Sequence, residues 1–121
     1  MGVTRVTVKV CRVDQPEKCE TVRDLVVDTG ATATVLPSEV IAKLGIKPHS
    51  KRAFTLADGT STEEKDVSSA LIEIDGRKTS DDIIAVDKGI PLLSVRALEG
   101  LGMQVDPKTG KLSKSDTSLL L

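Results

Sequence analysis

The sequence predicts one mainly β domain that carries two short helices. Three observations predict this fold class: apolar residues mostly recur at every second position, turn-forming residues separate these runs at short intervals, and 121 residues suit one domain. No linker, internal repeat or low-complexity segment interrupts the runs. We therefore expect a single domain over residues 1–112, followed by a C-terminal tail over residues 113–121.

The first two predicted strands are joined by a turn. Val6, Val8 and Val10 alternate with polar or small residues, which is typical of a half-buried strand. Residues 14–17 are Asp-Gln-Pro-Glu, a composition typical of turns. Residues 22–27 are continuous enough in apolar character to predict a central strand.

Hairpins and the two helices make up the rest of the predicted domain. Pro37 suits the first turn of a helix over residues 38–44, and Gly45 supplies its C-terminal stop. A second helix is expected over residues 95–101, and it ends at Gly102. Three hairpins are predicted from turn-forming residues at 58–59, 75–76 and 107–110.

Composition excludes several classes of function. Lys and Arg number 17 against 18 Asp and Glu, and Phe54 is the only aromatic residue, so neither a basic surface nor a stacking platform for nucleic acid is expected. No apolar run approaches the roughly 18 residues of a membrane span. The N-terminus has the pattern of an alternating strand and not that of a signal peptide. We therefore expect a cytoplasmic protein without nucleic-acid or membrane partners.

Two cysteines, Cys11 and Cys19, flank the first predicted turn. If the hairpin is symmetric about Gln15, the cysteines face each other and a cross-strand disulfide is geometrically possible. In a reducing cytosol two free thiols are favoured instead. A structural metal is not expected, because only His49 could join the cysteines and it lies far along the chain. No cofactor is expected either.

The most informative stretch comes directly after the apolar residues 25–27, where the chain continues Asp28-Thr29-Gly30-Ala31. A carboxylate that follows a buried strand costs free energy unless it is hydrogen-bonded or paired, so its presence indicates a function. Gly30 and Ala31 have almost no side chain and leave the backbone open to a ligand or another chain. Asp-Thr-Gly-Ala is the active-site signature of the aspartic peptidases.

The signature occurs once, whereas the chemistry of an aspartic peptidase needs two carboxylates. One ionised group takes a proton from water while one neutral group polarises the peptide carbonyl. Two aspartates about 3 Å apart titrate as a unit, because like charges so close cannot both ionise easily. One chain cannot supply this pair. Two copies related by a two-fold axis can, with Asp28 of each chain meeting on the axis.

The chain resembles the retropepsins, the single-domain aspartic proteases of retroviruses and of related cellular and prokaryotic proteins. The resemblance extends over about residues 20–105, and its blocks stand in the family's order. They are the signature, Thr-Val-Leu-Pro at 34–37, Leu-Ile-Glu-Ile-Asp-Gly-Arg-Lys at 71–78 and Pro-Leu-Leu-Ser at 91–94. The resemblance implies a closed β-barrel that acts as a two-fold homodimer and hydrolyses extended peptides.

The resemblance also implies a role for each residue around the signature. Asp28 is the catalytic residue, Thr29 bonds to its mate across the axis, and Gly30 and Ala31 let a peptide lie close as an added strand. The other implied substrate contacts are Thr32, Leu92 beside the dyad, and the tip of a closing flap at Ala57, Asp58, Gly59 and Thr60. Each role has an ordinary alternative. Asp28 could simply shape a turn, the hairpin that includes residues 57–60 could be an ordinary exposed hairpin, and Leu92 could be a core residue.

Three departures from the retroviral pattern bear on activity. Ser94 stands where the family usually has Gly; it can cap the next helix, but it loosens the loop that holds Asp28 if the family's Gly is needed for close packing. Thr32 and Val95 are neutral where retroviral enzymes carry an acid and an arginine, and the flap tip is polar. A second hypothesis is therefore a dimeric scaffold that binds peptides and cleaves them poorly or not at all.

Overall fold

The computed structural model describes residues 3–56 and 59–114, and over these residues it is mainly β with two short helices. In chain order the elements are β1 (Arg5–Cys11), β2 (Cys19–Asp28), β3 (Thr34–Pro37), α1 (Ser38–Leu44), β4 (Ser50–Thr55), β5 (Thr62–Ile74), β6 (Arg77–Val86), β7 (Leu92–Ser94), α2 (Val95–Gly100), β8 (Met103–Val105) and β9 (Leu112–Lys114). Strand β9 ends two residues beyond the domain boundary expected at residue 112.

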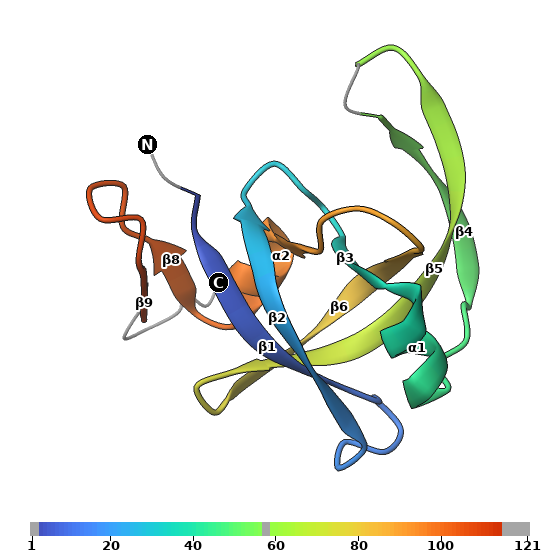
Figure 1. Ribbon diagram of the computed structural model, residues 1–121, viewed down its shortest axis with the longest axis horizontal. Helices are drawn as coiled ribbons and strands as arrows, with labels where there is room; N and C mark the ends of the chain where they lie inside the picture. Colours follow the sequence, from blue (N-terminus) through green and yellow to red (C-terminus); the bar gives the residue numbers. More distant parts are fainter. Residues whose placement is uncertain (1–2, 57–58, 115–121) are drawn as a thin grey trace, which may run out of the picture.

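Six strands close into a barrel (Figure 1). Neighbouring strands follow the order β1-β2-β7-β3-β6-β5, and β5 pairs back with β1. Strand β4 pairs with the first part of β5, and together they extend from the barrel as a two-stranded arm, which we call the β4–β5 arm. The predicted closed, mainly β barrel with two short helices is confirmed.

Aliphatic side chains fill the barrel. Its fully buried residues include Leu25, Leu36, Ile72, Ile83 and Leu93. A second, smaller cluster contains Ala33, Val67 and Ile84, with Val35 and Phe54 packed against it. Because neighbouring residues of a strand face opposite ways, Ile83 lies in the barrel interior and the adjacent Ile84 lies in this outer cluster.

A bulge sets the phase of strand β2. Val6 of β1 pairs with Leu25 and Val8 pairs with Val22, so β2 has one residue more than β1 between these two pairs. Asp24 within the bulge has a φ of 59°, a left-handed conformation that Asp tolerates. Val22 and Leu25 are therefore both buried although they lie three positions apart. The central strand predicted here is confirmed, and it continues to Asp28.

Strand β5 is one continuous strand of 13 residues that connects the predicted turns at 58–59 and 75–76. Its first part pairs with β4 as far as Val67, and from Ser68 onward it pairs with β6. The predicted turn between β5 and β6 is confirmed: Asp75 and Gly76 have φ values of 51° and 79°, the type I′ conformation that Asp-Gly favours.

Both helices lie where the sequence predicts them. Helix α1 spans Ser38–Leu44 and ends at Gly45, whose φ of 70° gives the left-handed C-cap. Helix α2 spans Val95–Gly100, one residue shorter than predicted. Over residues 3–56 and 59–114, neither helix has the length and apolar character needed to cross a bilayer.

The interpretation of the two cysteines as free thiols is wrong. Cys11 and Cys19 are directly opposite in the β1–β2 pair, with Cα atoms 4.1 Å apart, and they form a disulfide. The hairpin is therefore regular enough to bring the two sulfurs together, as its symmetry allowed. A disulfide is typical of oxidising compartments, so it does not support the cytoplasmic location expected from the sequence, which stays a prediction.

Candidate active site

Asp28 is the last residue of β2 and its side chain is half-buried. The backbone N–H of Gly30 donates to the Asp28 carboxylate Oδ1 at 2.9 Å, and the N–H of Ala31 donates to the Asp28 carbonyl at 3.0 Å. The chain thus forms a tight turn at the carboxylate, because an Asp side chain can accept a hydrogen bond from the backbone N–H two residues further on. We call residues 28–33 the signature loop.

The Asp28 carboxylate has no ionic partner within the part of the chain that the structure describes. The described residues also contain no group of three or more His, Cys, Asp or Glu side chains that could hold a metal ion, at Asp28 or at any other place. The second carboxylate that the resemblance implies for this site stays a prediction.

Strand β7 supports the signature loop from the side. It lies parallel to the end of β2, with Leu93 beside Val27 and Ser94 beside Asp28. One residue further on, the N–H of Val95 donates to the Ala31 carbonyl at 3.1 Å. The strand and the first residue of α2 therefore hold the loop at two points.

A cavity of about 460 Å³ opens beside Asp28. Its walls come from the signature loop, β3, the β4–β5 arm, β6 and β7, and its lining residues are Asp28, Gly30, Ala31, Thr32, Ala33, Val35, Phe54, Thr55, Lys65, Ile84, Val86 and Leu92. Most of this lining is apolar, so the cavity suits an apolar side chain of a ligand.

Five of the predicted site residues line this cavity: Asp28, Gly30, Ala31, Thr32 and Leu92. Thr29 is exposed on the signature loop and outside the cavity lining. Gly59 and Thr60 are exposed at the tip of the β4–β5 arm, whereas Ala57 and Asp58 lie outside the described residues. The catalytic and binding roles of these residues stay predictions.

Sequence reasoning missed the outer wall of the cavity. Phe54 and Lys65 come from the β4–β5 arm, and Ile84 and Val86 come from β6. The alternation of β6 could have separated Ile84 and Val86 from the core-facing Ile83, but no sequence signal indicates that this outer face meets the arm.

The β4–β5 arm has a closed hairpin tip. The N–H of Leu56 donates to the Ser61 carbonyl, and the N–H of Gly59 donates to the Leu56 carbonyl, both at 2.9 Å. The predicted hairpin is confirmed, and because Phe54 and Lys65 line the cavity, the arm forms one of its walls. Its action as a flap over substrate stays a prediction.

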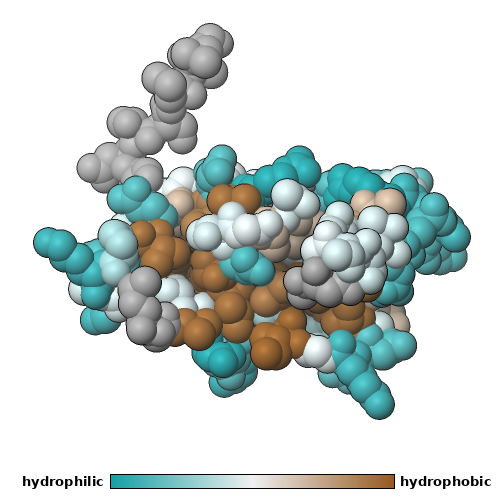
Figure 2. All heavy atoms as spheres, turned by 90° about the horizontal axis from the view of Figure 1, so that it is seen from above, coloured by the Kyte–Doolittle hydropathy of each residue, from teal (hydrophilic) through white to brown (hydrophobic). Residues whose placement is uncertain are grey.

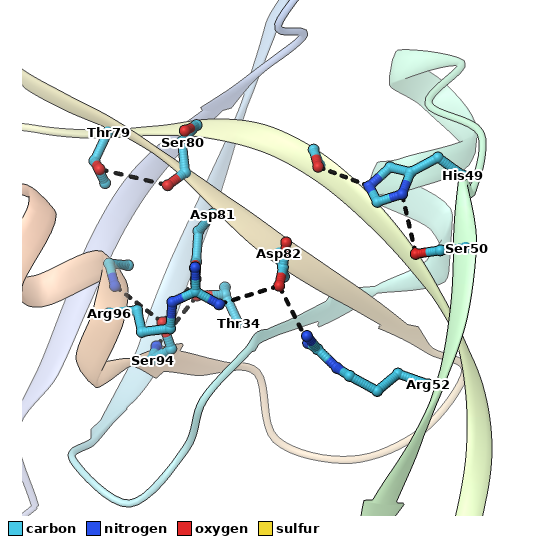
Figure 3. Close-up of polar contacts among 12 residues, drawn as sticks. Thr34, His49, Ser50, Arg52, Thr79, Ser80, Asp81, Asp82, Ser94 and Arg96 are labelled. Carbon is cyan, nitrogen blue, oxygen red and sulfur yellow. Dashed lines mark hydrogen bonds and ion pairs between the residues drawn. The ribbon is translucent and has the colours of Figure 1, made fainter.

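Ion pairs join the arm to helix α2 (Figure 3). Asp82 on β6 accepts hydrogen bonds at its Oδ2 from Arg52 of β4 at 3.1 Å and from Arg96 of α2 at 3.2 Å. The Arg52 guanidinium also lies 5.0 Å from the ring centroid of Phe54, which is the usual range of a cation–π contact. The base of the arm is thereby connected to the helix that follows β7.

Ser94 occupies the position where retroviral enzymes usually have glycine. Its hydroxyl accepts a hydrogen bond from the Ala97 N–H at 3.0 Å, so the predicted N-cap of α2 is confirmed. The same hydroxyl donates to Asp81 at 2.6 Å. A glycine here would supply neither contact.

The model of the family described as "Aspartyl protease" matches residues 8–105, which include the signature loop and β7. The chain belongs to the aspartyl protease family. No curated protein matches the chain. The placement of a single aspartyl protease signature at one end of a closed barrel agrees with the retropepsin resemblance deduced from the sequence.

Two solved structures are similar to this aspartyl protease family member. EIAV protease in complex with the inhibitor HBY-793 is 18% identical in sequence, with a TM-score of 0.55. The match covers 84% of this chain and 89% of the EIAV protease chain. The solution structure of Simian Foamy Virus (mac) protease is also 18% identical in sequence, with a TM-score of 0.52. That match covers 78% of this chain and 93% of the foamy virus chain. At this identity the likeness shows the fold, and it confirms that the barrel is retropepsin-like.

Proposed function

We propose that this member of the aspartyl protease family is a homodimeric aspartic endopeptidase. The observation that carries the proposal is Asp28, a half-buried carboxylate that its signature loop holds at the edge of an apolar cavity without an ionic partner in the described chain. A second copy of the chain would bring the missing acid to the two-fold axis. The extended peptide substrate would lie between the dyad and the β4–β5 arm.

In the proposed reaction a water lies between the two Asp28 carboxyl groups. The ionised carboxylate takes a proton from the water as its oxygen attacks the scissile carbonyl carbon, while the neutral carboxyl donates a hydrogen bond to the carbonyl oxygen. The tetrahedral intermediate, an oxyanion that accepts this hydrogen bond, then collapses: the amide nitrogen receives one of the two protons that the dyad now holds, and the C–N bond breaks. The products are a carboxylic acid and an amine, and the dyad again holds one proton.

Exposed apolar side chains support a second copy on the face that carries the signature loop. In Figure 1 this loop and the tip of the β4–β5 arm both reach the upper side of the molecule, and Figure 2 shows apolar atoms gathered along the middle of that face. The exposed large apolar side chains of the described residues include Val3 before β1, Leu56 directly after β4 and Ile90 before β7, which are 61%, 37% and 60% exposed. Apolar atoms exposed together on one face are a common feature of protein interfaces.

Digestion of a mixed peptide library at acidic and at neutral pH tests the proposal. Cleavage is expected from the parent protein and not from Asp28→Asn, with inhibition by statine-type transition-state mimics and no effect of EDTA. Sedimentation at micromolar concentration should give a mass near twice 12.8 kDa. A protein that stays monomeric at every accessible concentration, or cleavage that EDTA abolishes, would contradict the proposal.

One observation favours a second candidate function, a peptide-binding dimer that does not cleave. The described tip of the arm includes the polar residues Thr60 and Ser61, whereas a flap that excludes water is better served by apolar ones. If the parent binds statine-type peptides in calorimetry yet leaves the whole library intact, the binding function is supported and the peptidase function fails.

A further inference from the structure

We propose that Asp81 is a positioning residue for Asp28, which acts through a buried network of Thr34, Asp81 and Ser94. The inference rests on the proposed function, because it assigns to this network the task of holding the catalytic carboxylate in place. Asp81 comes from β6, Thr34 begins β3, and Ser94 ends β7. Figure 3 shows these three side chains between the elements that surround the signature loop.

The network is an expensive feature for a barrel interior. Asp81 is 6% exposed, and Thr34 and Ser94 are 0% exposed. Among the described residues no Lys, Arg or His forms an ion pair with the Asp81 carboxylate. A buried carboxyl group costs folding free energy that an apolar residue of similar volume would not, so its presence in the interior indicates a role other than packing.

Hydrogen-bond directions make Asp81 the acceptor that orients both hydroxyls. Thr34 and Ser94 each donate to Asp81 Oδ2, at 2.7 and 2.6 Å. Each hydroxyl also accepts a backbone N–H: Thr34 from Ser94 at 3.2 Å, and Ser94 from Ala97 at 3.0 Å. Each hydroxyl has one proton, which it donates to Asp81, and its oxygen stays free to accept the backbone N–H. The carboxylate acceptor at position 81 therefore allows all four hydrogen bonds to form at once.

Through these contacts the network reaches the signature loop at two places. Ser94 pairs in register with Asp28, and the next residue, Val95, donates its N–H to the Ala31 carbonyl. Thr34 follows the last residue of the loop and is the first residue of β3. Asp81 thus ties the strand beside the loop to the point where the loop ends, and the residues between them carry the Gly30 N–H that holds the Asp28 carboxylate.

The test compares two substitutions at one position. Thr34→Val keeps the size of the side chain and removes the hydroxyl, whereas Thr34→Ser keeps the hydroxyl. Ser38→Ala is the control for a hydroxyl–carboxylate contact elsewhere, because Ser38 donates to Asp87 at 2.6 Å on an exposed part of the molecule. For each protein, amide hydrogen exchange is measured at Val95 and at Ile72, a fully buried residue of β5, and kcat and KM are measured on a cleaved peptide.

Thr34→Val is expected to speed exchange at Val95 at least tenfold with little change at Ile72, and to lower kcat at least tenfold with KM nearly unchanged. Thr34→Ser and Ser38→Ala should match the parent. Equal acceleration at Val95 and Ile72, or no change at Val95, would overturn the proposal, because the network would then serve global stability alone.

Two further outcomes also test the proposal: a variant that does not fold, and a parent protein that does not cleave. If Thr34→Val does not fold, Ser94→Gly carries the same comparison, and failure of both to fold would overturn the proposal by making the network a folding requirement. If the parent protein cleaves no peptide, the proposed function fails by itself, and the exchange rates at Val95 and Ile72 still decide whether the network holds the signature loop.

Discussion

The two ends of strand β2 differ in how far the chain completes them. At the Cys19 end the strand is bonded covalently to β1, and the neighbouring Arg12 donates to the carbonyl oxygens of Leu44 and Gly45, which connects the hairpin to the end of α1. At the Asp28 end a half-buried carboxylate borders an open cavity. The two ends lie on opposite sides of the barrel (Figure 1).

The comparison teaches which contacts of this fold are complete within the described chain and which are not. At the Cys19 end the Arg12 guanidinium has its acceptors within the chain, since it also pairs with Asp14 at 2.7 Å. At the Asp28 end the only described donor to the carboxylate is a backbone N–H. Under the proposed function, a second carboxylate from another copy and the substrate would complete this site.

The largest expected effect is the loss of cleavage in Asp28→Asn. Removal of the acid from both chains should reduce kcat by about 10²–10⁴-fold or more, the usual contribution of general acid–base catalysis. The fold should persist, because no ion pair in the described chain depends on this carboxylate. Peptide cleavage and thermal melting of the variant and the parent measure both parts.

Asp24→Asn is the matched control for this substitution. Asp24 is an exposed aspartate on the same strand, and Asn tolerates its left-handed conformation as well as Asp does. It should cleave at the parental rate. Cleavage that survives in Asp28→Asn would place the chemistry elsewhere, and an unfolded Asp28→Asn would make Asp28 a structural residue.

The second effect is on stability and belongs to the opposite end of β2. Replacing Cys11 and Cys19 together by Ala opens a loop with a sequence separation of 8, which should lower the free energy of unfolding by about 2–3 kcal/mol. Urea unfolding of the oxidised parent and the double variant measures the difference. At temperatures where both are folded, kcat should be equal, and a tenfold loss of kcat in the variant would show that the two ends are coupled.

The third expected effect is on the stability of the proposed dimer, and it tests which end of β2 lies at the interface. Ile90→Asp should weaken the dimer about tenfold, roughly 1.4 kcal/mol, because it places a charge in the exposed apolar face near the signature loop. Val13→Asp is the control, since Val13 is 50% exposed in the turn at the Cys19 end. Sedimentation equilibrium gives both dissociation constants. Equal weakening by the two substitutions, or weakening by Val13→Asp alone, would move the interface to another face.

The smallest expected effect is a pH dependence at the Cys19 end. The hydrogen bond from Arg12 lowers the pKa of Asp14 below its ordinary value. The stabilisation is therefore fully present above the ordinary Asp pKa of about 3.9 and is lost as the pH falls through the lower value in the folded protein. Because both groups are at the surface, the effect should be small and weakened by salt.

Thermal melting of the parent and of Asp14→Asn between pH 2 and pH 7 measures this dependence. The difference in Tm should be constant above about pH 5, should shrink below about pH 4, and should be smaller in high salt. A difference that instead grows as the pH falls would reverse the sign and contradict the assigned contact.

Local features of this protein were predictable because their causes lie within a few residues. The helix at Ser38–Leu44 has its stop at Gly45, where a left-handed φ is needed, and the turn at Asp75–Gly76 needs two positive φ values. The signature at the end of β2 is a local pattern too. Each of these required no knowledge of where the rest of the chain lies.

Only the tertiary structure decided the features that join distant parts of the chain. Strands β3 and β7 have four and three residues, too few for a periodic pattern, and they form because neighbouring strands pair with them. The cysteines form a disulfide because the hairpin register places them opposite each other. The wall of the cavity and the contact between Thr34 and Asp81, 47 residues apart, likewise depend on how the barrel closes.

The sequence by itself therefore determined the family, through one aspartate in a recognisable setting, and the tertiary structure decided what holds that aspartate and what surrounds it. The physical reason is the range of the interactions. Turn and helix signals depend on the backbone of a few consecutive residues, whereas a buried hydrogen bond such as the one between Ser94 and Asp81 exists only after closure of the barrel has excluded water from both groups.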